Sequence, residues 1–473
     1  MTLPGPLIII GAPLAMAVVL LLLRRWTTLS AWLAALTAGL MGLLVATAPL
    51  KTAMQLGNFQ FALGRPLIIL GRELIVRNVD APAIAFLFFT TAGLFILAWR
   101  LLPHSNFFPV GLATVALLSG ALMVSQVVYA ALFIEIAAIF AVFPLHEGRT
   151  RAQGGLRFMA YTTLALPGLM VTQLLLDLFT IFPNDVGLLS TSAALLSVSF
   201  IILMGAVPFQ AWLSAVTDDG SPPVVTFIFT VNQGAVWFML LDYLQTYTWL
   251  SGQGAFGPFI TAAGILMMTL GGLLAASQRK LGRLVGYATL VDNGALLLAL
   301  GTHQTAGIAL AALLLMARPF SLGLMTLGLA GLRQLGNGAD TREALAGAAW
   351  RAPWRTAAFL VGGIALAGFP LSLGFAARWG LYRLVAEITV SQAIAALAGS
   401  AGVMLGLVFT MRSLFVPPLR DEDAPPPPPF TEDRVVIVLI AVLMAIVLSL
   451  GLFPQLLSRV ALQMAQGYTF FGP

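Results

Sequence analysis

Residues 199–213 read SFIILMGAVPFQAWL, and residues 360–375 read LVGGIALAGFPLSLGF. Both stretches are apolar enough to lie in a membrane-spanning helix, yet each carries a proline near its middle, Pro208 in the first and Pro370 in the second. Proline removes an intrahelical hydrogen bond and clashes with the preceding turn. We therefore expect both helices to be kinked or unwound at these positions.

A glycine stands just before each proline, at Gly205 and Gly368, so the two interruptions match. The prolines are 162 residues apart, which fits a repeat of five helices. Matching interruptions in two halves of a chain are typical of inverted repeats around a transport path. Two unrelated proline kinks are the simpler alternative, since membrane helices tolerate proline.

The composition places the chain in a lipid bilayer. Of its 473 residues, 59% are hydrophobic and only 9% are charged, and the mean hydropathy is +0.97. Soluble domains carry about 25% charged residues, so a cytosolic enzyme and a nucleic-acid binder are excluded. The net charge of +6 does not indicate nucleic acid, because the basic residues lie in short loops. The chain has no cysteine, which removes disulfides and thiolate metal sites.

Apolar runs of about 20 residues, the length of a membrane-spanning helix, occur about fourteen times. We expect spans at 6–23, 30–49, 81–99, 107–125, 127–145, 158–182, 189–214, 223–245, 257–277, 284–301, 306–332, 356–385, 391–412 and 435–455. The short alternating segments of a membrane barrel are absent. The predicted fold is an all-α integral membrane protein with two inverted five-helix repeats and broken helices 7 and 12.

The predicted spans divide the chain into four parts. These are helices 1–3 with a hairpin-like segment (1–105), a first inverted repeat of helices 4–8 (106–250), a second of helices 9–13 (251–415), and a Pro-rich loop with helix 14 (416–473). Residues 51–80 alternate enough to suggest an external β-hairpin or an interfacial stretch. Residues 421–434, DEDAPPPPPFTEDR, predict an extended loop that is either a solvated linker or a docking segment.

The distribution of Lys and Arg predicts the orientation. Loops after odd-numbered spans hold sixteen of the 24 basic residues, and the opposite side holds five. Because cytoplasmic loops carry the excess of Lys and Arg, we expect a multi-pass protein of the cell inner (plasma) membrane with both termini on the non-cytoplasmic side. The first apolar run precedes Arg24 and Arg25, which favours a first span over a cleavable signal peptide.

Two acidic residues fall inside predicted spans, Glu135 in helix 5 and Asp292 in helix 10, which are equivalent helices of the proposed repeats. An ionisable group at bilayer depth is costly, so it normally faces a polar interior and serves a function. A structural polar contact is the alternative for both. Asp177 and Asp242 fall near the ends of predicted spans, where we expect them to reach water.

Several segments resemble the antiporter-like, proton-translocating membrane subunits of respiratory complex I and of the Mrp antiporters. The stretch GAVPFQAWLSAVTDDGSPPVVTFIFTVNQ (205–233) is similar to the hallmark sequence of that family, and QRKLGRLVGYATLVDNG (278–294) to its tenth-helix entrance. ALAGFPLSLGFAARW (365–379) resembles its broken twelfth helix, and Glu135 falls where the family has a fifth-helix glutamate. The resemblance covers nearly the whole chain and implies fourteen helices with both termini outside.

The chain departs from the family at its buried lysines and histidines. Leu203 stands where the family has its seventh-helix lysine, and Gln210 where it has the histidine after Pro-Phe. Gln233 falls at the eighth-helix lysine or histidine, and Arg378 at the twelfth-helix lysine. Pro319 and Gly323 fall near the eleventh-helix positions, with Arg318 beside them. Lysine can pass a proton when burial and a neighbouring acid adjust it, whereas arginine stays protonated and leucine carries no proton. We expect the charged Arg378 to be paired.

The resemblance implies a membrane-arm subunit of a complex I-type NADH-quinone oxidoreductase that contributes to proton translocation coupled to quinone reduction. It would use Glu135, Asp292 and water, with Arg378 as a fixed charge. Two alternatives remain open. One is a degenerate scaffold paralogue that does not conduct, and the other is a related cation/proton antiporter or inorganic-carbon uptake subunit.

The sequence predicts no redox site of its own. It has no Gly-rich nucleotide loop after a strand and only three histidines, too few for haem or metal ligation. We expect no cofactor and no metal, and a non-redox role in the respiratory chain. The expected partners are the other membrane subunits of a complex, the lipid bilayer and protons, and no nucleic acid.

Overall fold

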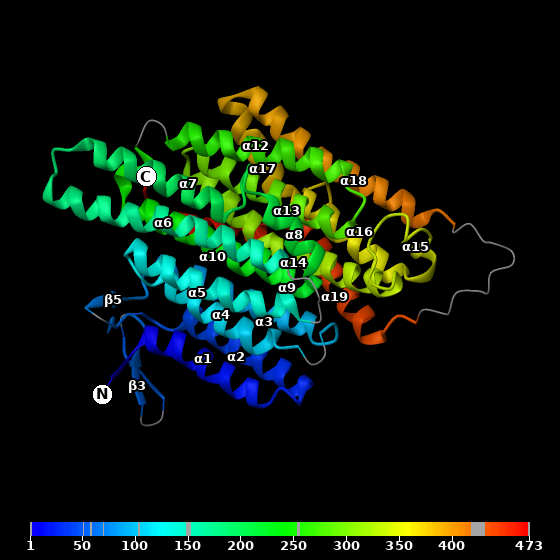
Figure 1. The fold of residues 1–473 in the computed structure, drawn as a ribbon, viewed down its shortest axis with the longest axis horizontal. Coiled ribbons are helices and arrows are strands. Elements are labelled where there is room, and N and C mark those ends of the chain that lie inside the picture. The colour runs from blue at the N-terminus through cyan, green and yellow to red at the C-terminus, as the bar shows by residue number, and fades with distance from the viewer. Residues whose placement is uncertain are drawn as a thin grey trace.

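The computed structural model describes residues 2–50, 52–56, 59–69, 71–102, 105–147, 153–252, 256–417 and 431–471. Long helices run side by side along the molecule, and both termini lie at the same end (Figure 1). A helix satisfies all of its backbone hydrogen bonds within one segment, which the interior of a bilayer demands. The expected mostly helical membrane fold is confirmed. Residues 418–430, which hold most of the expected extended loop, lie outside the described residues.

Twelve helices of the described part are long and apolar enough to cross a membrane. They are α1 (Gly5–Leu22), α2 (Thr27–Thr47), α3 (Asp80–Ala98), α5 (Val127–His146), α6 (Gln153–Ile181), α7 (Val186–Leu203), the continuous run of α9 (Pro222–Phe227), η1 (Ile228–Asn232) and α10 (Gln233–Thr246), then α12 (Phe256–Ser277), α13 (Leu281–Gly301), α14 (Thr305–Leu335), α18 (Val390–Phe415) and α19 (Arg434–Leu452). The shorter helices are α4 (Phe107–Leu122), α8 (Ala211–Asp219), α11 (Thr248–Ser251), α15 (Ala348–Arg351), α16 (Pro353–Ala367), α17 (Phe375–Ile388) and α20 (Gln455–Gln466).

Both predicted helix breaks are confirmed. The chain leaves the helix after Leu203 and re-enters it at Ala211, so the interruption contains Gly205 and Pro208. It leaves α16 after Ala367 and starts α17 at Phe375, so Gly368 and Pro370 lie between two half-helices. Whether the two halves are inverted repeats stays a prediction.

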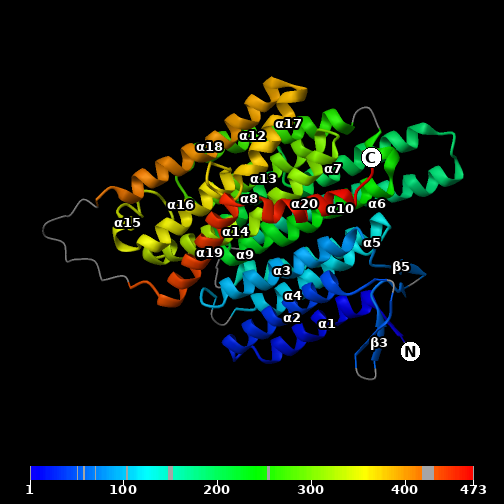
Figure 2. The same cartoon turned by 180° about the vertical axis from the view of Figure 1, so that it is seen from behind.

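The end of the fold adds one helix that was not expected. The expected span over 435–455 is found as α19, which ends at Leu452, and a second helix, α20, follows after Pro454. Proline cannot continue a helix without losing a backbone hydrogen bond, so the chain turns there. The helix α20 then packs against α14 and brings the carboxyl end back toward the amino terminus (Figure 2).

Short strands at the end near the termini confirm the expected hairpin within 51–80. Strand β4 (Leu67–Ile69) pairs antiparallel with β5 (Arg72–Leu74). A second small sheet joins β1 (Thr2–Pro4), β3 (Phe59–Ala62) and β2 (Met54–Leu56), in that order. The parallel pairing of β1 with β3 was not expected, because it joins segments far apart in the sequence.

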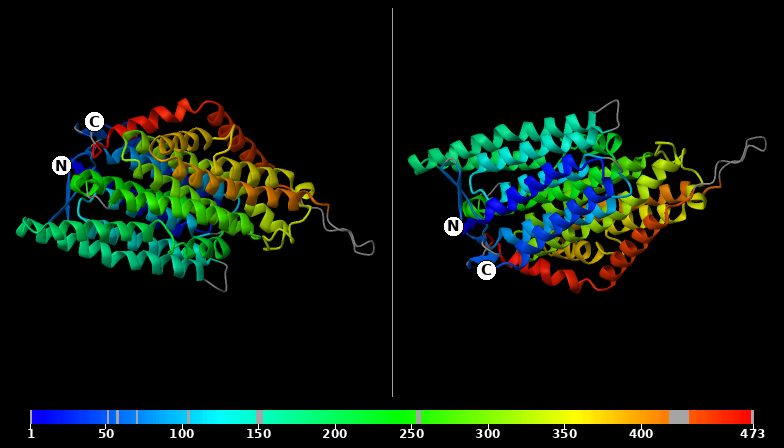
Figure 3. Two further views of the ribbon diagram at one scale, coloured as in Figure 1. Left: turned by 90° about the horizontal axis from the view of Figure 1, so that it is seen from above. Right: turned by 90° about the horizontal axis from the view of Figure 1, so that it is seen from below.

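The helices differ in how much of their surface the protein covers. The run of α9, η1 and α10 is buried along nearly its whole length and α13 along most of it, whereas most side chains of α6 and α19 are exposed or only partly buried. Figure 3 shows α6 and α7 at one edge of the bundle and α19 and α20 at the opposite edge. Apolar side chains exposed at these edges suit contact with lipid, while the buried helices can hold polar groups.

Glycines let α12 and α18 approach closely. A Cβ atom added to Gly399 would lie 2.4 Å from the carbonyl oxygen of Met268, and one added to Gly272 would meet the backbone of Gly399 at 2.2 Å. Small residues at such interfaces allow the backbone contacts that hold membrane helices together.

We predict that Gly399→Leu destabilises the fold, because the new side chain has no room between the α12 and α18 backbones. Overpacking of this kind costs about 1–3 kcal/mol. A Cβ atom on Gly93 in α3 meets nothing within 4 Å, so Gly93→Leu serves as the matched control. The midpoint of thermal unfolding should fall for Gly399→Leu and stay unchanged for Gly93→Leu, and an equal effect of both would refute the packing argument.

Candidate functional site

The second helix break positions an arginine in the protein interior. Gly368 ends α16 in the left-handed conformation, with φ 75°, which favours glycine over residues with a Cβ. A Cβ atom there would also lie 2.2 Å from Cγ of Arg378, the residue in the first turn of α17. Glycine is therefore required both for the turn and for the close passage of the Arg378 side chain.

Arg378 belongs to a buried triad with Asp292 and Arg318, which we call the charge triad. Nη2 of Arg378 donates to Oδ1 of Asp292 at 2.8 Å, and Nε of Arg318 donates to Oδ2 at 2.6 Å. All three side chains are buried, with 0% of each arginine side chain and 2% of the aspartate side chain exposed. The expectation that Arg378 is paired is confirmed.

Neutral groups help to compensate the second positive charge of the triad. The carbonyl oxygen of Leu366, in the last turn of α16, accepts from Arg378 at 3.3 Å, and Ser400 Oγ lies 3.4 Å from Nη1 of the same arginine. The carbonyl oxygen of Phe229 accepts from Arg318 at 3.3 Å. Phe229 lies in the π-helical turn η1, a wide turn that is frequent at functional sites because it rearranges the backbone hydrogen bonds.

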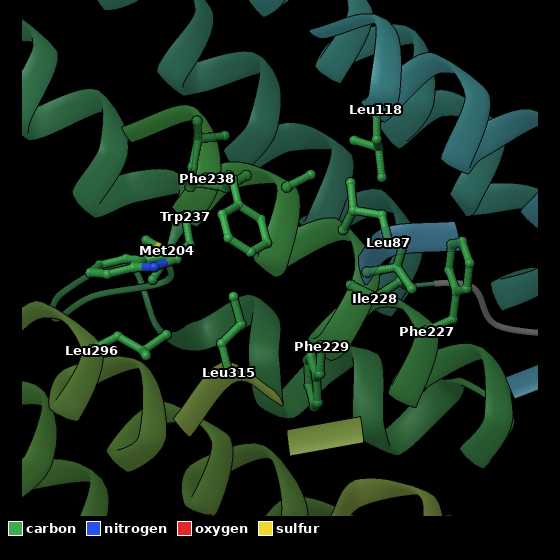
Figure 4. Close-up of a cluster of buried hydrophobic side chains, with 14 of the residues drawn as sticks. Leu87, Leu118, Met204, Phe227, Ile228, Phe229, Trp237, Phe238, Leu296 and Leu315 are labelled. Carbon is green, nitrogen blue, oxygen red and sulfur yellow. The ribbon is translucent and has the colours of Figure 1, made fainter. Parts of the chain in front are cut away.

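Apolar side chains surround this part of the bundle. Figure 4 shows Met204, Phe229, Leu296 and Leu315 gathered around the run of η1 and α10. Leu315 precedes Arg318 by three residues on α14, so the two share a helix face. Charges are little screened in such surroundings, and the ion pairs of the triad therefore interact strongly.

Buried amides continue the polar interior beyond the triad. Asn293 donates from Nδ2 to the carbonyl oxygen of Met204, at the break after α7, at 2.9 Å. The side-chain oxygens of Asn232, Gln233 and Asn293 are buried without a hydrogen-bond partner among the described residues. Because buried polar groups are nearly always hydrogen-bonded to protein or water, these amides are suitable neighbours for internal water.

The remaining predicted site residues lie elsewhere. Glu135 on α5 is half-buried, and its Oε1 accepts from Oγ1 of Thr163 on α6 at 2.6 Å, while Oε2 is buried without a partner among the described residues. Gln210 is half-buried at the start of α8. The structure thus brings Asp292, Arg318 and Arg378 together and gives Glu135 a separate polar contact.

Sequence reasoning missed several members of the interior. Asn293 directly follows Asp292, and Tyr382 donates to Ser400 at 2.6 Å, one turn after Arg378. Their only signal was proximity to a predicted site residue. The prediction that Asp242 reaches water was wrong: its side chain is buried and pairs with Arg77, which a loop brings to the same place.

Comparisons with known proteins identify the family. A family model described as NADH:quinone oxidoreductase/Mrp antiporter, TM matches residues 157–406. NADH-quinone oxidoreductase subunit N of Ectopseudomonas mendocina (strain ymp) is 30% identical over 261 residues, which are 53% of this chain and 51% of that relative. The chain thus spans about half the length of the curated relative it matches.

Solved structures share the fold at low identity. A chain of the Mrp complex from Dietzia sp. DQ12-45-1b superposes with a TM-score of 0.80 at 16% identity, over 98% of this chain and 97% of that one. A chain of respiratory complex I from Thermus thermophilus superposes with a TM-score of 0.77 at 19% identity, over 99% and 100% of the two chains. At such identities the likeness concerns the fold alone.

We predict that Asp292→Asn destabilises the protein strongly, because two buried guanidinium groups lose their counter-charge. Removing one partner of a buried ion pair costs about 3–5 kcal/mol. The double variant Asp292→Asn/Arg378→Gln has the same net charge at the triad as the natural chain and should recover part of this loss. The midpoint of thermal unfolding of the purified protein measures both. A double variant no more stable than Asp292→Asn would contradict the electrostatic explanation.

Proposed function

The chain belongs to the NADH:quinone oxidoreductase/Mrp antiporter family of membrane subunits, and on that premise we propose that it contributes to proton translocation within a multi-subunit membrane complex. The observation that carries the proposal is the charge triad. Asp292 and Arg318 lie at the middle of the long helices α13 and α14, and Arg378 lies in the first turn of α17. Buried ionisable groups of this kind are costly in a membrane and are normally retained for a function such as ion or proton movement.

The geometry limits which groups take part in this movement. Arginine does not release its proton, so Arg318 and Arg378 act as fixed charges. Each oxygen of the Asp292 carboxylate already accepts from a guanidinium group, so a proton can bind there only after one arginine gives up its hydrogen bond. Motion of Arg378 on the short helix α17 therefore couples to the protonation of Asp292. Buried amides such as Gln233 and Asn293 hold the water through which the proton reaches it.

Glu135 is the second carboxylate of the proposed path. Its free Oε2 and its contact with Thr163 leave it able to accept a proton. The proposed inverted five-helix repeats are residues 106–250 and 251–415. The breaks at Gly205 and Gly368 would be the points, one in each repeat, where backbone groups face the path. Gln210, at the end of the first break, would lie on the same path.

The assembly we favour is a complex I-type NADH-quinone oxidoreductase, in which this chain is a membrane-arm subunit coupled to quinone reduction elsewhere. Its partners would be neighbouring membrane subunits, lipid and protons. The excess of basic residues in alternate loops supports a plasma-membrane location with both termini on the non-cytoplasmic side.

A specific observation favours a second function, that of a scaffold without conduction. Leu203 replaces the seventh-helix lysine that the family resemblance implies, and the carboxylate of Asp292 bonds both arginines at once. With Asp292 bonded to both arginines, the triad holds α13, α14 and α17 together and needs no proton transfer to do so.

We predict that Glu135→Gln lowers the number of protons translocated per electron in the intact complex, because the amide cannot carry the proton. The measurement is proton uptake or release by liposomes containing the purified complex, at a measured rate of electron transfer. Asp292→Asn/Arg378→Gln should lower the ratio as well.

The control for both variants is Glu343→Gln, which changes an exposed carboxylate in the 336–347 loop. It should leave the ratio unchanged. An unchanged ratio in all three variants, with normal assembly, would establish the scaffold function in place of translocation.

A further inference from the structure

A second cluster of charges lies apart from the charge triad, at the end of the bundle where both termini lie. It consists of Arg77, Asp80 and Asp242, which we call the terminal cluster. Arg77 comes from the segment between β5 and α3, Asp80 is the first residue of α3, and Asp242 lies near the end of α10. The proposed translocation path makes no use of these residues.

Both carboxylates bind the same guanidinium group. Nε of Arg77 donates to Oδ2 of Asp80 at 2.8 Å, and Nη2 donates to Oδ1 of Asp80 at 3.3 Å. The same Nη2 donates to Oδ1 of Asp242 at 2.5 Å. The two acids therefore share one nitrogen atom, which brings their oxygens close to each other.

Burial differs between the acids and the arginine. The side chains of Asp80 and Asp242 are 3% and 5% exposed, whereas that of Arg77 is 29% exposed. The guanidinium group thus faces water on one side and the two buried carboxylates on the other. This arrangement gives a short connection between the water outside the bundle and the two acids.

The charges of the terminal cluster do not balance. Two carboxylates face one guanidinium group, and the other titratable groups that act on them in the described part of the chain are tyrosines, Tyr243 and Tyr468. Tyr247 interacts with Asp242 and also with Asp177, and neither Tyr247 nor Asp177 adds a positive charge. With both acids ionised, the cluster would bury a net negative charge, which is costly.

The surrounding groups respond to this negative charge. Burial lowers the pKa of Arg77, but the charges of Asp80 and Asp242 outweigh it and raise that pKa above its usual value. Burial, and then the charges of the two acids, raise the pKa of Tyr468, which follows α20. Arg77 therefore stays charged and Tyr468 stays neutral, so neither supplies the missing compensation by titration.

We propose that the terminal cluster is a proton-binding site in which Asp80 and Asp242 share one proton beside Arg77. One added proton makes the cluster neutral, and it exchanges with water past the partly exposed guanidinium group. Beside the two acids, the hydroxyl of Tyr243 is buried without a hydrogen-bond partner in the described part of the chain. It is therefore free to accept from, or donate to, a carboxyl group of either form.

The site is distinct from the proposed translocation path and stands whether or not that path conducts. The proton binds by moving from water to a carboxylate oxygen, so it needs no other reactant. Loss of the proton leaves a negative charge buried between α3 and α10. This charge weakens the contact between the start of α3 and the end of α10. Proton binding at this end of the bundle is thereby linked to the packing of α3 against α10.

The test is infrared difference spectroscopy of the intact complex in lipid nanodiscs, titrated from about pH 6 to pH 9, well above the usual range of aspartate. The natural chain should show the carbonyl stretch of a protonated carboxylic acid near neutral pH, and the band should disappear as the pH rises. Asp242→Asn and Asp80→Asn should each remove the band. In either variant the charge of the remaining carboxylate is neutralised by Arg77, so the cluster needs no bound proton.

Glu73→Gln is the matched control, since it removes an exposed carboxylate on β5, near the same end of the bundle. It should leave the band unchanged. Two results would overturn the proposal: no protonated carboxylic acid in the natural chain at neutral pH, or a band that persists in both cluster variants. Neither readout depends on translocation, so failure of the proposed function leaves this test intact.

Stability gives a second readout. A group that holds a proton in the folded state and releases it on unfolding makes the fold less stable as the pH rises. The unfolding midpoint of the natural chain should therefore fall between about pH 6 and pH 9, and Asp242→Asn should flatten this dependence. Equal slopes in the natural chain and in Asp242→Asn would contradict a shared proton.

Discussion

The ion pairs of Asp292 with Arg318 and Arg378 are the constraint on which the interior of this protein depends. They join α13, α14 and α17 at a depth where water is scarce and each unpaired charge is costly. The break before α17 serves them, because it leaves the carbonyl oxygen of Leu366 available to accept from Arg378. A continuous helix would keep that carbonyl for its own backbone ladder.

The sequence predicted the helices well, because a membrane span is defined by length and hydropathy, which are local properties. It also predicted both breaks, because a glycine and a proline stand close together within each apolar stretch, Gly205 with Pro208 and Gly368 with Pro370. It missed α20, because this helix is only 12 residues long, too short for an apolar span, and follows Pro454 at the end of the last predicted span. The parallel pairing of β1 with β3 depends on contacts between distant segments and had no local signal.

The candidate site was predicted only residue by residue. Asp292, Arg318 and Arg378 each stood out as charges in apolar segments, but their pairing joins positions 26 and 86 residues apart, which spacing alone cannot reveal. Asp242 was misassigned because a residue near a helix end usually reaches water. Its partner Arg77 lies in a loop, and only the folded chain shows that this loop covers the end of α10.

The charge triad and the terminal cluster are opposite in composition, and this difference separates what each can do. The triad has two arginines for one aspartate, so its excess charge is positive. The cluster of Arg77, Asp80 and Asp242 has two acids for one arginine, so its excess charge is negative and a proton neutralises it. Arginine cannot replace lysine as a proton carrier. Where the family resemblance implies buried lysines, this chain has Arg378 and Leu203, so the proton movement that we propose would depend on its carboxylates.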